Sequence, residues 1–197
     1  MSNKAPYRNA RRTNKAIKLA FLKLLGEKDI SKIKVIEITE LADISKGTFY
    51  THFKDVESVL DEIENDSLSS LREFLKPLEC YDLLSNFTPL LINIFKKVEQ
   101  EKDLYKLIFT SSCRDRFIKK LQSTFVNYMM SQYHQVIKFK EKDSAKYYFN
   151  FISGGTASII YEWVLYGHAL TIEELAININ TGLIYGVSSI FKDLPLK

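Results

Sequence analysis

Lys46-Gly47-Thr48-Phe49-Tyr50-Thr51-His52-Phe53-Lys54 has the residue pattern of a short helix with two unlike faces. At about 100° per residue, Phe49 and Phe53 fall on one face. The opposite face carries small, hydroxyl and basic residues, namely Gly47, Tyr50, Thr51 and Lys54, with Lys46, Thr48 and His52 at its flanks. No residue of the stretch is acidic, so this face offers hydrogen-bond donors and positive charge. That composition is typical of a helix lying in a DNA groove, although an ordinary solvated face is the alternative.

A second short helix and a tight turn precede this stretch. The helix is expected to turn Ile38, Leu41 and Ala42 inward, and the chain then turns at Asp43-Ile44. Ser45 follows as an N-cap, because its hydroxyl can accept a hydrogen bond from an amide in the first turn of the next helix. Two short helices joined in this way predict a helix-turn-helix, although many helical hairpins share the spacing by chance.

An amphipathic helix is predicted before this motif and another after it. The first runs from about Asn14 to a stop at Gly26, after a loose basic arm at residues 1–10, and the second is capped by Asp55. The small core of the N-terminal third is expected to contain Ile17, Phe21, Ile38, Leu41, Ile44, Phe49 and Phe53.

Positive charge is concentrated in the N-terminal third of the 197-residue chain. Residues 1–60 hold 12 basic and 7 acidic residues, whereas the whole chain has a net charge of only +4. A positive field of this kind favours binding to a polyanion, with a solubilising tail as the alternative. Because the charges lead directly into the helix-turn-helix, DNA is the expected partner.

The run from Ile38 to Asp55 closely resembles the signature of the tetracycline-repressor (TetR) family of transcriptional regulators, and the likeness extends over roughly residues 9–69. The resemblance implies that six residues lie in or beside the major groove: Lys46, Gly47, Thr48, Tyr50, His52 and Lys54. Thr51 is expected to join them because it lies on the same exposed face, and the predicted DNA-binding set also includes the N-cap Ser45 and, as a phosphate contact, Lys34. Three positions depart from the family pattern. Asp43 replaces the turn glycine, Lys34 replaces a threonine, and Val56 replaces a lysine that often binds phosphate.

The remaining sequence predicts further helices, giving an all-α chain of about nine helices in two domains, 1–69 and 70–197. A long helix is expected from Val56 to a break at Pro77, with a second irregularity at Pro89. A short helix follows at Asp103–Thr110, then a helix from Arg114 to Phe139 and an exposed connection at Lys138–Lys146.

The last two predicted helices carry more apolar surface than one chain of this size can cover. In Ala145–Tyr166 the aromatic residues surround the helix, and Gly167 ends it. Thr171 and Glu174 form a capping box that opens the final helix. Excess apolar surface indicates a partner, here a second copy meeting these helices at Gly154, Ala157, Ser158, Tyr161, Leu183 and Val187. Internal core is the alternative for each helix taken singly.

Neither an enzyme nor a membrane protein is expected. His52 belongs to the DNA-facing helix, while His134 and His168 lack a spaced carboxylate or cysteine partner, so no catalytic site, metal or cofactor is predicted. Cys80 and Cys113 fit a reducing cytoplasm. No signal peptide is expected, because the N-terminal residues lack an apolar run, and Tyr147–Tyr166 contains too many polar residues to span a bilayer.

The predicted function is that of a cytoplasmic, homodimeric repressor, which leaves a near-palindromic operator when a small effector binds. Phe and Tyr residues in the middle of the chain could line a pocket for an apolar or aromatic effector, but core packing explains each of them equally well, so no ligand-binding residue is assigned. The alternative is a co-activator of the same fold that is switched by a partner protein.

Overall fold

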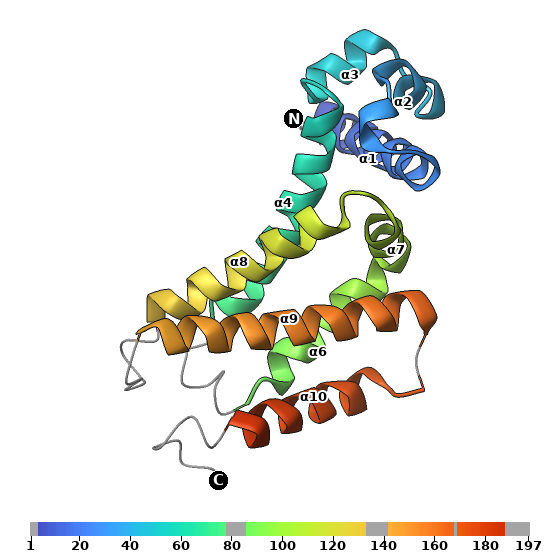
Figure 1. The fold of residues 1–197 in the computed structure, drawn as a ribbon. Helices are drawn as coiled ribbons and strands as arrows, with labels where there is room; N and C mark the ends of the chain where they lie inside the picture. The colour runs from blue at the N-terminus through green and yellow to red at the C-terminus, as the bar shows by residue number, and fades with distance from the viewer. Residues whose placement is uncertain (1–3, 78–85, 133–141, 168, 188–197) are drawn as a thin grey trace. The chain divides into compact units, whose positions relative to one another are not determined.

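The computed structural model describes residues 4–77, 86–132, 142–167 and 169–187, and the regular structure in these ranges is helical (Figure 1). The elements are α1 (Lys4–Glu27), the 3₁₀ turn η1 (Ile30–Lys32), α2 (Val35–Leu41), α3 (Lys46–His52), α4 (Val56–Leu75), α6 (Thr88–Gln100), α7 (Lys102–Thr110), α8 (Arg114–Gln132), α9 (Lys142–Tyr166) and α10 (Ile172–Val187). The expected all-α fold is therefore confirmed. Within these ranges, no helix combines the length and apolarity that crossing a membrane requires.

Packing divides the chain into two units. The first combines Met1–Ser67 with Asp103–Phe117, and the second combines Leu68–Lys102 with Ile118–Lys197. The first unit thus ends close to the boundary expected after residue 69, but it also includes a segment from much later in the sequence. That segment contains most of α7 and the first turn of α8.

The core of the first unit forms around the helix-turn-helix. Ile17, Phe21, Ile38 and Phe49 are fully buried, and Phe53 is 3% exposed. Asp43 adopts a positive φ of 52° in the turn between α2 and α3, as expected for a residue at the glycine position of this motif. Asp tolerates this left-handed conformation better than most residues, so the turn forms without glycine.

Two residues that were expected in the core of this unit are not fully buried. Leu41 is 46% exposed and Ile44 is only partly buried, whereas Thr39 is 3% exposed. The Thr39 hydroxyl donates to the Ile36 carbonyl at 2.8 Å, which satisfies its polar group inside the core. The core-facing side of α2 therefore carries Thr39, whose hydroxyl is hydrogen-bonded, and not Leu41 as expected.

The first helix differs from the expectation at both ends. It begins at Lys4, so residues 4–10 are helical and do not form a loose arm; Pro6 lies in the first turn, where the missing N–H costs nothing. Gly26 lies inside α1 and does not stop it. A Cβ added to Gly26 would approach Leu107 Cδ2 to 2.8 Å, so this glycine permits close packing of α7.

The second unit is built from α6, α9 and α10 together with most of α8 and the end of α4. Phe95 of α6 meets Trp163 of α9 edge to face at 5.2 Å, and the Asn180 side chain of α10 accepts from the Phe87 amide at 2.7 Å. The Tyr128 hydroxyl donates to the Leu75 carbonyl at 2.9 Å. These contacts join α6 to α9 and the start of α6 to α10, and they join α8 to the end of α4.

Helix ends in the second unit follow the sequence signals closely. The φ of +84° at Gly167 confirms the expected end of α9, and the Thr171–Glu174 capping box opens α10. Pro89 stands in the first turn of α6, so it starts a helix and does not interrupt one. An exposed connection was expected at Lys138–Lys146, but α9 begins at Lys142, so residues 142–146 are helical. Residues 138–141 and the predicted extension of α8 beyond Gln132 lie outside the described residues.

Candidate nucleic-acid interface

The α3 helix is held by one cap and one buried ring. Ser45 Oγ accepts from the Thr48 amide at 3.0 Å, which confirms the expected N-cap. Phe49 is fully buried, with its ring centroid 5.9 Å from that of Phe53. Tyr50, the next residue, is 58% exposed and meets Phe49 edge to face at 5.5 Å. A single buried anchor therefore fixes which face of α3 points to solvent.

The solvent-facing side of α3 presents donors without a carboxylate. Lys46, Gly47, Tyr50 and Thr51 are exposed, and Thr48 and His52 are partly exposed. A Cβ added to Gly47 would meet only Ser45 Oγ, at 3.6 Å, so this glycine is not required for packing within the chain. The missing side chain instead leaves a low point on the face, where another molecule could approach the backbone closely.

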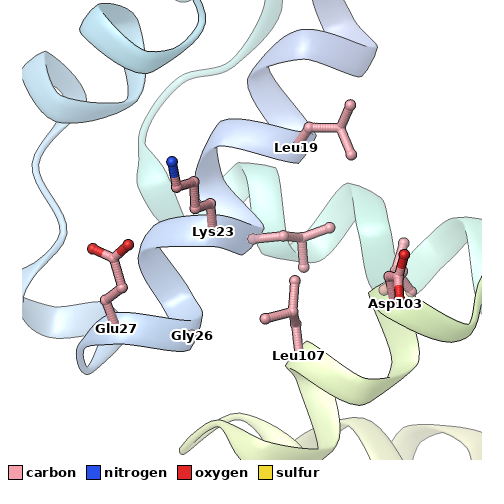
Figure 2. A pocket seen from close by; sticks show the side chains of 8 residues that line it. Leu19, Lys23, Gly26, Glu27, Asp103 and Leu107 are labelled. Carbon is pink, nitrogen blue, oxygen red and sulfur yellow. The ribbon is translucent and has the colours of Figure 1, made fainter.

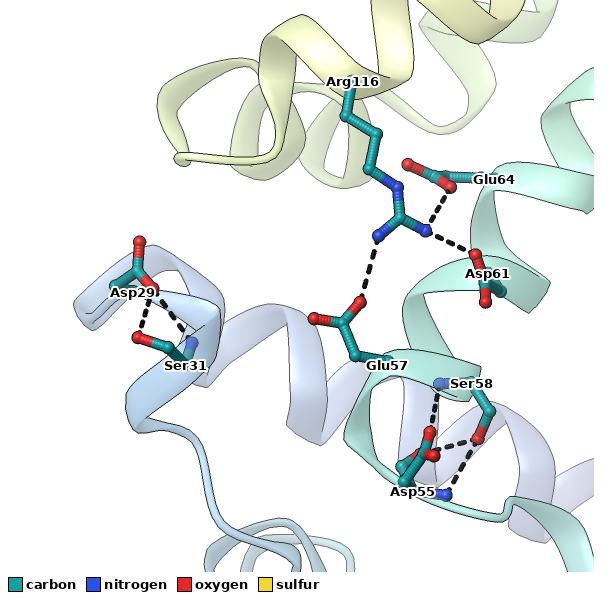
Figure 3. A network of polar contacts seen from close by, with 8 residues as sticks. All are labelled: Asp29, Ser31, Asp55, Glu57, Ser58, Asp61, Glu64 and Arg116. Carbon is teal, nitrogen blue, oxygen red and sulfur yellow. Dashed lines mark hydrogen bonds and ion pairs between the residues drawn. The ribbon is translucent and has the colours of Figure 1, made fainter.

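Lys54 does not belong to α3, contrary to the expectation from the helical pattern. The helix ends at His52, and Phe53 has extended backbone angles of φ −136° and ψ 139°. Lys54 is exposed in the turn that follows. The extended backbone allows Asp55 to cap α4: the Ser58 amide donates to Asp55 Oδ1 at 2.8 Å, and Ser58 Oγ accepts from the Asp55 amide at 3.1 Å (Figure 3).

Lys34 lies at the start of α2 and is exposed. An ammonium group cannot accept a hydrogen bond, so the cap that threonine would provide is absent. The Glu37 carboxylate instead accepts from the Lys34 amide at 2.9 Å. Glu37 also pairs with Lys28, and the hydrogen bond from Lys28, followed by the one from the Lys34 backbone, lowers the pKa of Glu37. The Lys34 side chain is thus left for another role.

A surface groove joins the starts of α2 and α4 to the exposed side of α3. Its lining residues are Ile33, Lys34, Val35, Ile36, Lys46, Tyr50, Asp55, Val56 and Glu57. Three of the residues predicted to contact DNA therefore line one groove: Lys34, Lys46 and Tyr50. Asp55 and Glu57 are the acidic residues of its lining, at the start of α4.

Ion pairs fix α4 against α1. Lys18 Nζ lies 2.9 Å from Glu62 Oε1 and 2.7 Å from Asp66 Oδ2, and the Asn14 side chain donates to Glu62 at 2.9 Å. Burial opposes the charge on Lys18, but the two carboxylates outweigh it and raise the pKa of this ammonium group. Near the end of α1, the Asp29 carboxylate caps η1 by accepting hydrogen bonds from the Ser31 hydroxyl and the Ser31 amide (Figure 3). The bond from the hydroxyl has the larger effect of the two, and such bonds lower the pKa of Asp29 to about 2.

A further ion-pair network was not foreseen from the sequence. The Arg116 guanidinium, in the first turn of α8, lies 3.0 Å from Glu57 Oε2 and 3.0 Å from Glu64 Oε2, and it also pairs with Asp61 (Figure 3). The acids at positions 57, 61 and 64 share one face of α4, a spacing that was visible in the sequence. Their partner is more than 50 residues away, beyond the reach of local periodicity.

An apolar groove also lies between α1 and α7 (Figure 2). Leu19, which is 58% exposed, lines it together with Leu22, Leu104 and Leu107, and charged residues stand at its rim. Gly26 forms part of the lining, at the point where α7 approaches most closely. The groove lies within the first unit and contains none of the predicted DNA-binding residues.

The residues predicted to form a dimer interface have mixed exposure within one chain. On α9, Ser158 is exposed, and Gly154, Ala157 and Tyr161 are partly exposed. On α10, Leu183 is 8% exposed, and the Val187 side chain lies outside the described residues. Several large side chains on these helices that the prediction did not include are well exposed, among them Tyr147 at 76%, Phe151 at 66%, Tyr166 at 75% and Tyr185 at 71%.

In the described ranges, no group of three histidine, cysteine, aspartate or glutamate side chains is arranged to hold a metal ion. His52 lies on α3 with its ring 6.5 Å from that of Phe53. His134, His168 and Cys80 lie outside the described residues, whereas Cys113 is buried as a free thiol, and burial raises its pKa. A raised thiol pKa disfavours the reactive thiolate.

Comparison with known proteins identifies the class of this helix-turn-helix chain. Residues 85–184, about half of the chain, match the TetR-type family model described as "Transcriptional regulator C-terminal region". The chain belongs to the TetR family of transcriptional regulators. A search of curated proteins gave no match.

Solved structures share this fold at low sequence identity. A TetR transcriptional regulator from Streptococcus agalactiae 2603V gives a TM-score of 0.63 at 22% identity, with 92% of this chain and 99% of that chain covered. The fatty acid degradation regulator FadR from Bacillus halodurans gives 0.61 at 17% identity, with 89% and 96% covered. The dihydroxyacetone kinase operon activator DhaS gives 0.58 at 18% identity, with 91% and 98% covered.

Proposed function

We propose that this TetR-family protein is a cytoplasmic homodimer that represses transcription by placing α3 of each subunit in the major groove of a near-palindromic operator. The observation that carries the proposal is the exposed side of α3. It carries Lys46, Gly47, Tyr50 and Thr51 and no carboxylate, and the fully buried Phe49 anchors the other side of the helix. A rigid helix face of this composition suits a groove lined by phosphates and base edges.

Separate roles follow for the residues around this face. Tyr50, Thr51, Thr48 and His52 would contact bases or set the position of the helix, and Ser45 would hold its first turn. Lys34, Lys46 and Lys54 would contact phosphates on either side. Phosphate contacts contribute affinity at every sequence, whereas base contacts distinguish one sequence from another.

The second unit would provide dimerisation and control. The α9 surface with Gly154, Ala157 and Ser158 allows close approach of a second copy, which would set the spacing of the two α3 helices. A small apolar or aromatic effector bound in this unit would release the operator by changing that spacing. No enzymatic step is required by this function.

Activation of transcription is the second candidate. One solved structure of similar fold is named an operon activator, DhaS. In this version the fold and the DNA contacts are the same, but a partner protein would switch the regulator instead of a small molecule. A partner that copurifies in stoichiometric amount, with no metabolite changing DNA affinity, would favour this candidate.

The test uses duplex DNA that the wild-type protein enriches from a random-sequence pool. Tyr50→Ala removes an exposed side chain, so folding should be unaffected while affinity for the enriched duplex falls about tenfold or more. Lys119→Ala, an exposed change on α8 in the second unit, is the matched control and should bind like the wild type. Equal binding by Tyr50→Ala, or no enrichment by the wild type, would contradict the proposal.

A further inference from the structure

The groove beside α3 has one acidic neighbour whose charge is offset from outside the helix-turn-helix. Glu57 lines the same groove as Lys34 and Lys46. Its Oε2 atom lies 3.0 Å from the Arg116 guanidinium, which comes from the first turn of α8 (Figure 3). The surface that faces DNA in the proposed function therefore depends on a residue 59 positions further along the chain.

Arg116 is surrounded by more negative charge than it carries. Glu57, Asp61 and Glu64 occupy one face of α4 across two turns, and each contacts the guanidinium. The Glu64 side chain is fully buried, whereas Glu57 and Asp61 are about half exposed. A planar guanidinium can serve several carboxylates at once, which a lysine ammonium would do less well.

Loss of the Arg116 guanidinium would make the electrostatic potential at the groove more negative. Three carboxylates would then face α8 without its charge, and the one nearest the groove would be free to turn toward Lys34 and Lys46. Either effect opposes a DNA phosphate, because like charges repel and because a lysine paired with Glu57 has less to offer a phosphate.

We infer that Arg116 is a positioning residue for DNA binding: it holds the carboxylate of Glu57, which lines the groove, in an ion pair and offsets the acidic face of α4. This inference rests on the proposed function, since it needs α3 and its groove to face DNA. It adds a requirement that the helix-turn-helix alone does not meet, because Arg116 lies in the Asp103–Phe117 segment of the first unit.

The experiment compares two arginines of the same helix on the DNA enriched by the wild type. Arg116→Gln and Arg114→Gln change the net charge equally, and Arg114 pairs with its sequence neighbour Asp115 at 2.9 Å. At low salt, affinity should fall at least threefold further for Arg116→Gln than for Arg114→Gln, and the gap should narrow as salt increases. Equal losses in the two variants would overturn the inference.

Charge reversal at Glu57 separates an electrostatic role from a merely structural one. Arg116→Gln removes the guanidinium that lies 3.0 Å from the buried Glu64 carboxylate, which could unfold the chain, so the working background is Arg116→Gln with Glu64→Gln. In that folded background, DNA affinity should again be low, and adding Glu57→Gln should restore it to within about twofold of wild type. Failure of Glu57→Gln to restore binding would overturn the inference.

The proposed function and the role of Arg116 would be contradicted by different results of this experiment. If the wild type enriches no DNA sequence, the proposed function is wrong and the role of Arg116 is wrong with it. If the wild type binds and every Arg116 variant binds equally well, only the role of Arg116 is overturned.

Discussion

At the scale of single residues, α3 is governed by a division between anchoring and exposed side chains. Phe49 is fully buried and Ser45 caps the helix, so these two residues hold it in place. Lys46, Tyr50 and Thr51 are exposed to solvent. Substitutions of the first kind should affect stability, and those of the second kind should affect binding.

Lys54 tests the backbone contacts. It is exposed in the turn after α3, where it would meet a phosphate and not a base edge. Lys54→Ala should weaken binding similarly across DNA sequences and reduce the salt slope of the affinity by about 1. Titrations at several salt concentrations measure this slope, with Lys119→Ala as control. An unchanged slope would mean that Lys54 does not contact a phosphate.

Asp43 tests the turn. Its φ of 52° strains any residue with a Cβ, although Asp less than most. Asp43→Ala should therefore lower the free energy of unfolding by about 1 kcal/mol, because alanine gains nothing from the left-handed conformation. Asp43→Gly should be at least as stable as wild type. Denaturant unfolding measures both, and equal stability of the alanine and glycine variants would exclude strain at this position.

At the scale of elements, local signals predicted helices and caps well, but distant packing decided the exceptions. The Ser45 cap, the Gly167 stop and the Thr171–Glu174 box involve residues close in sequence, so the pattern contained them. Leu41 and Thr39 exchange roles because the surroundings of α2, and not its periodicity, decide which side is buried.

The sequence likewise predicted those parts of the candidate site that depend on residues close together in the chain. The exposed face of α3 follows from its own sequence, whereas the end of the helix at His52 follows from the Asp55 cap of the next one. The Arg116 network joins residues 52 to 59 positions apart, and a pattern of acids on α4 gives no indication of which distant arginine pairs with them.

The N-terminal turns of α1 test whether a helical extension serves DNA binding. Residues 4–10 continue a helix whose Arg11 and Arg12 are exposed. Deleting residues 1–10 should lower DNA affinity, because basic residues Lys4 and Arg8 are lost. The melting temperature should change little, since the first buried position among the described side chains of α1 is Ile17. Deleting residues 1–3 is the control. If DNA affinity is unchanged after the longer deletion, the extension serves solubility and does not contact DNA.

At the scale of the whole molecule, the account depends on two copies acting together. A single helix-turn-helix contacts too few bases for selective binding, and two must lie roughly 34–36 Å apart to meet successive major grooves. The partly exposed Gly154 and Ala157 and the exposed Phe151 and Ser158 of α9 provide the proposed contact surface.

Ala157→Arg tests this assembly. A bulky charge at a close contact should split the dimer, or unfold it if the monomer is unstable, and operator affinity should fall although α3 is unchanged. Sedimentation equilibrium of wild type and variant measures assembly, with Lys146→Arg, an exposed change on α9, as control. A variant that remains dimeric would place the interface elsewhere.

Footprinting of the protein on the chromosome of its native host tests the central claim most directly. The account predicts a small number of protected sites, each with two inverted half-sites centred about 10 base pairs apart or a multiple of that spacing, and loss of these sites in Tyr50→Ala. Protection that is uniform along the chromosome, or specific sites that persist in Tyr50→Ala, would contradict the claim that α3 reads the operator.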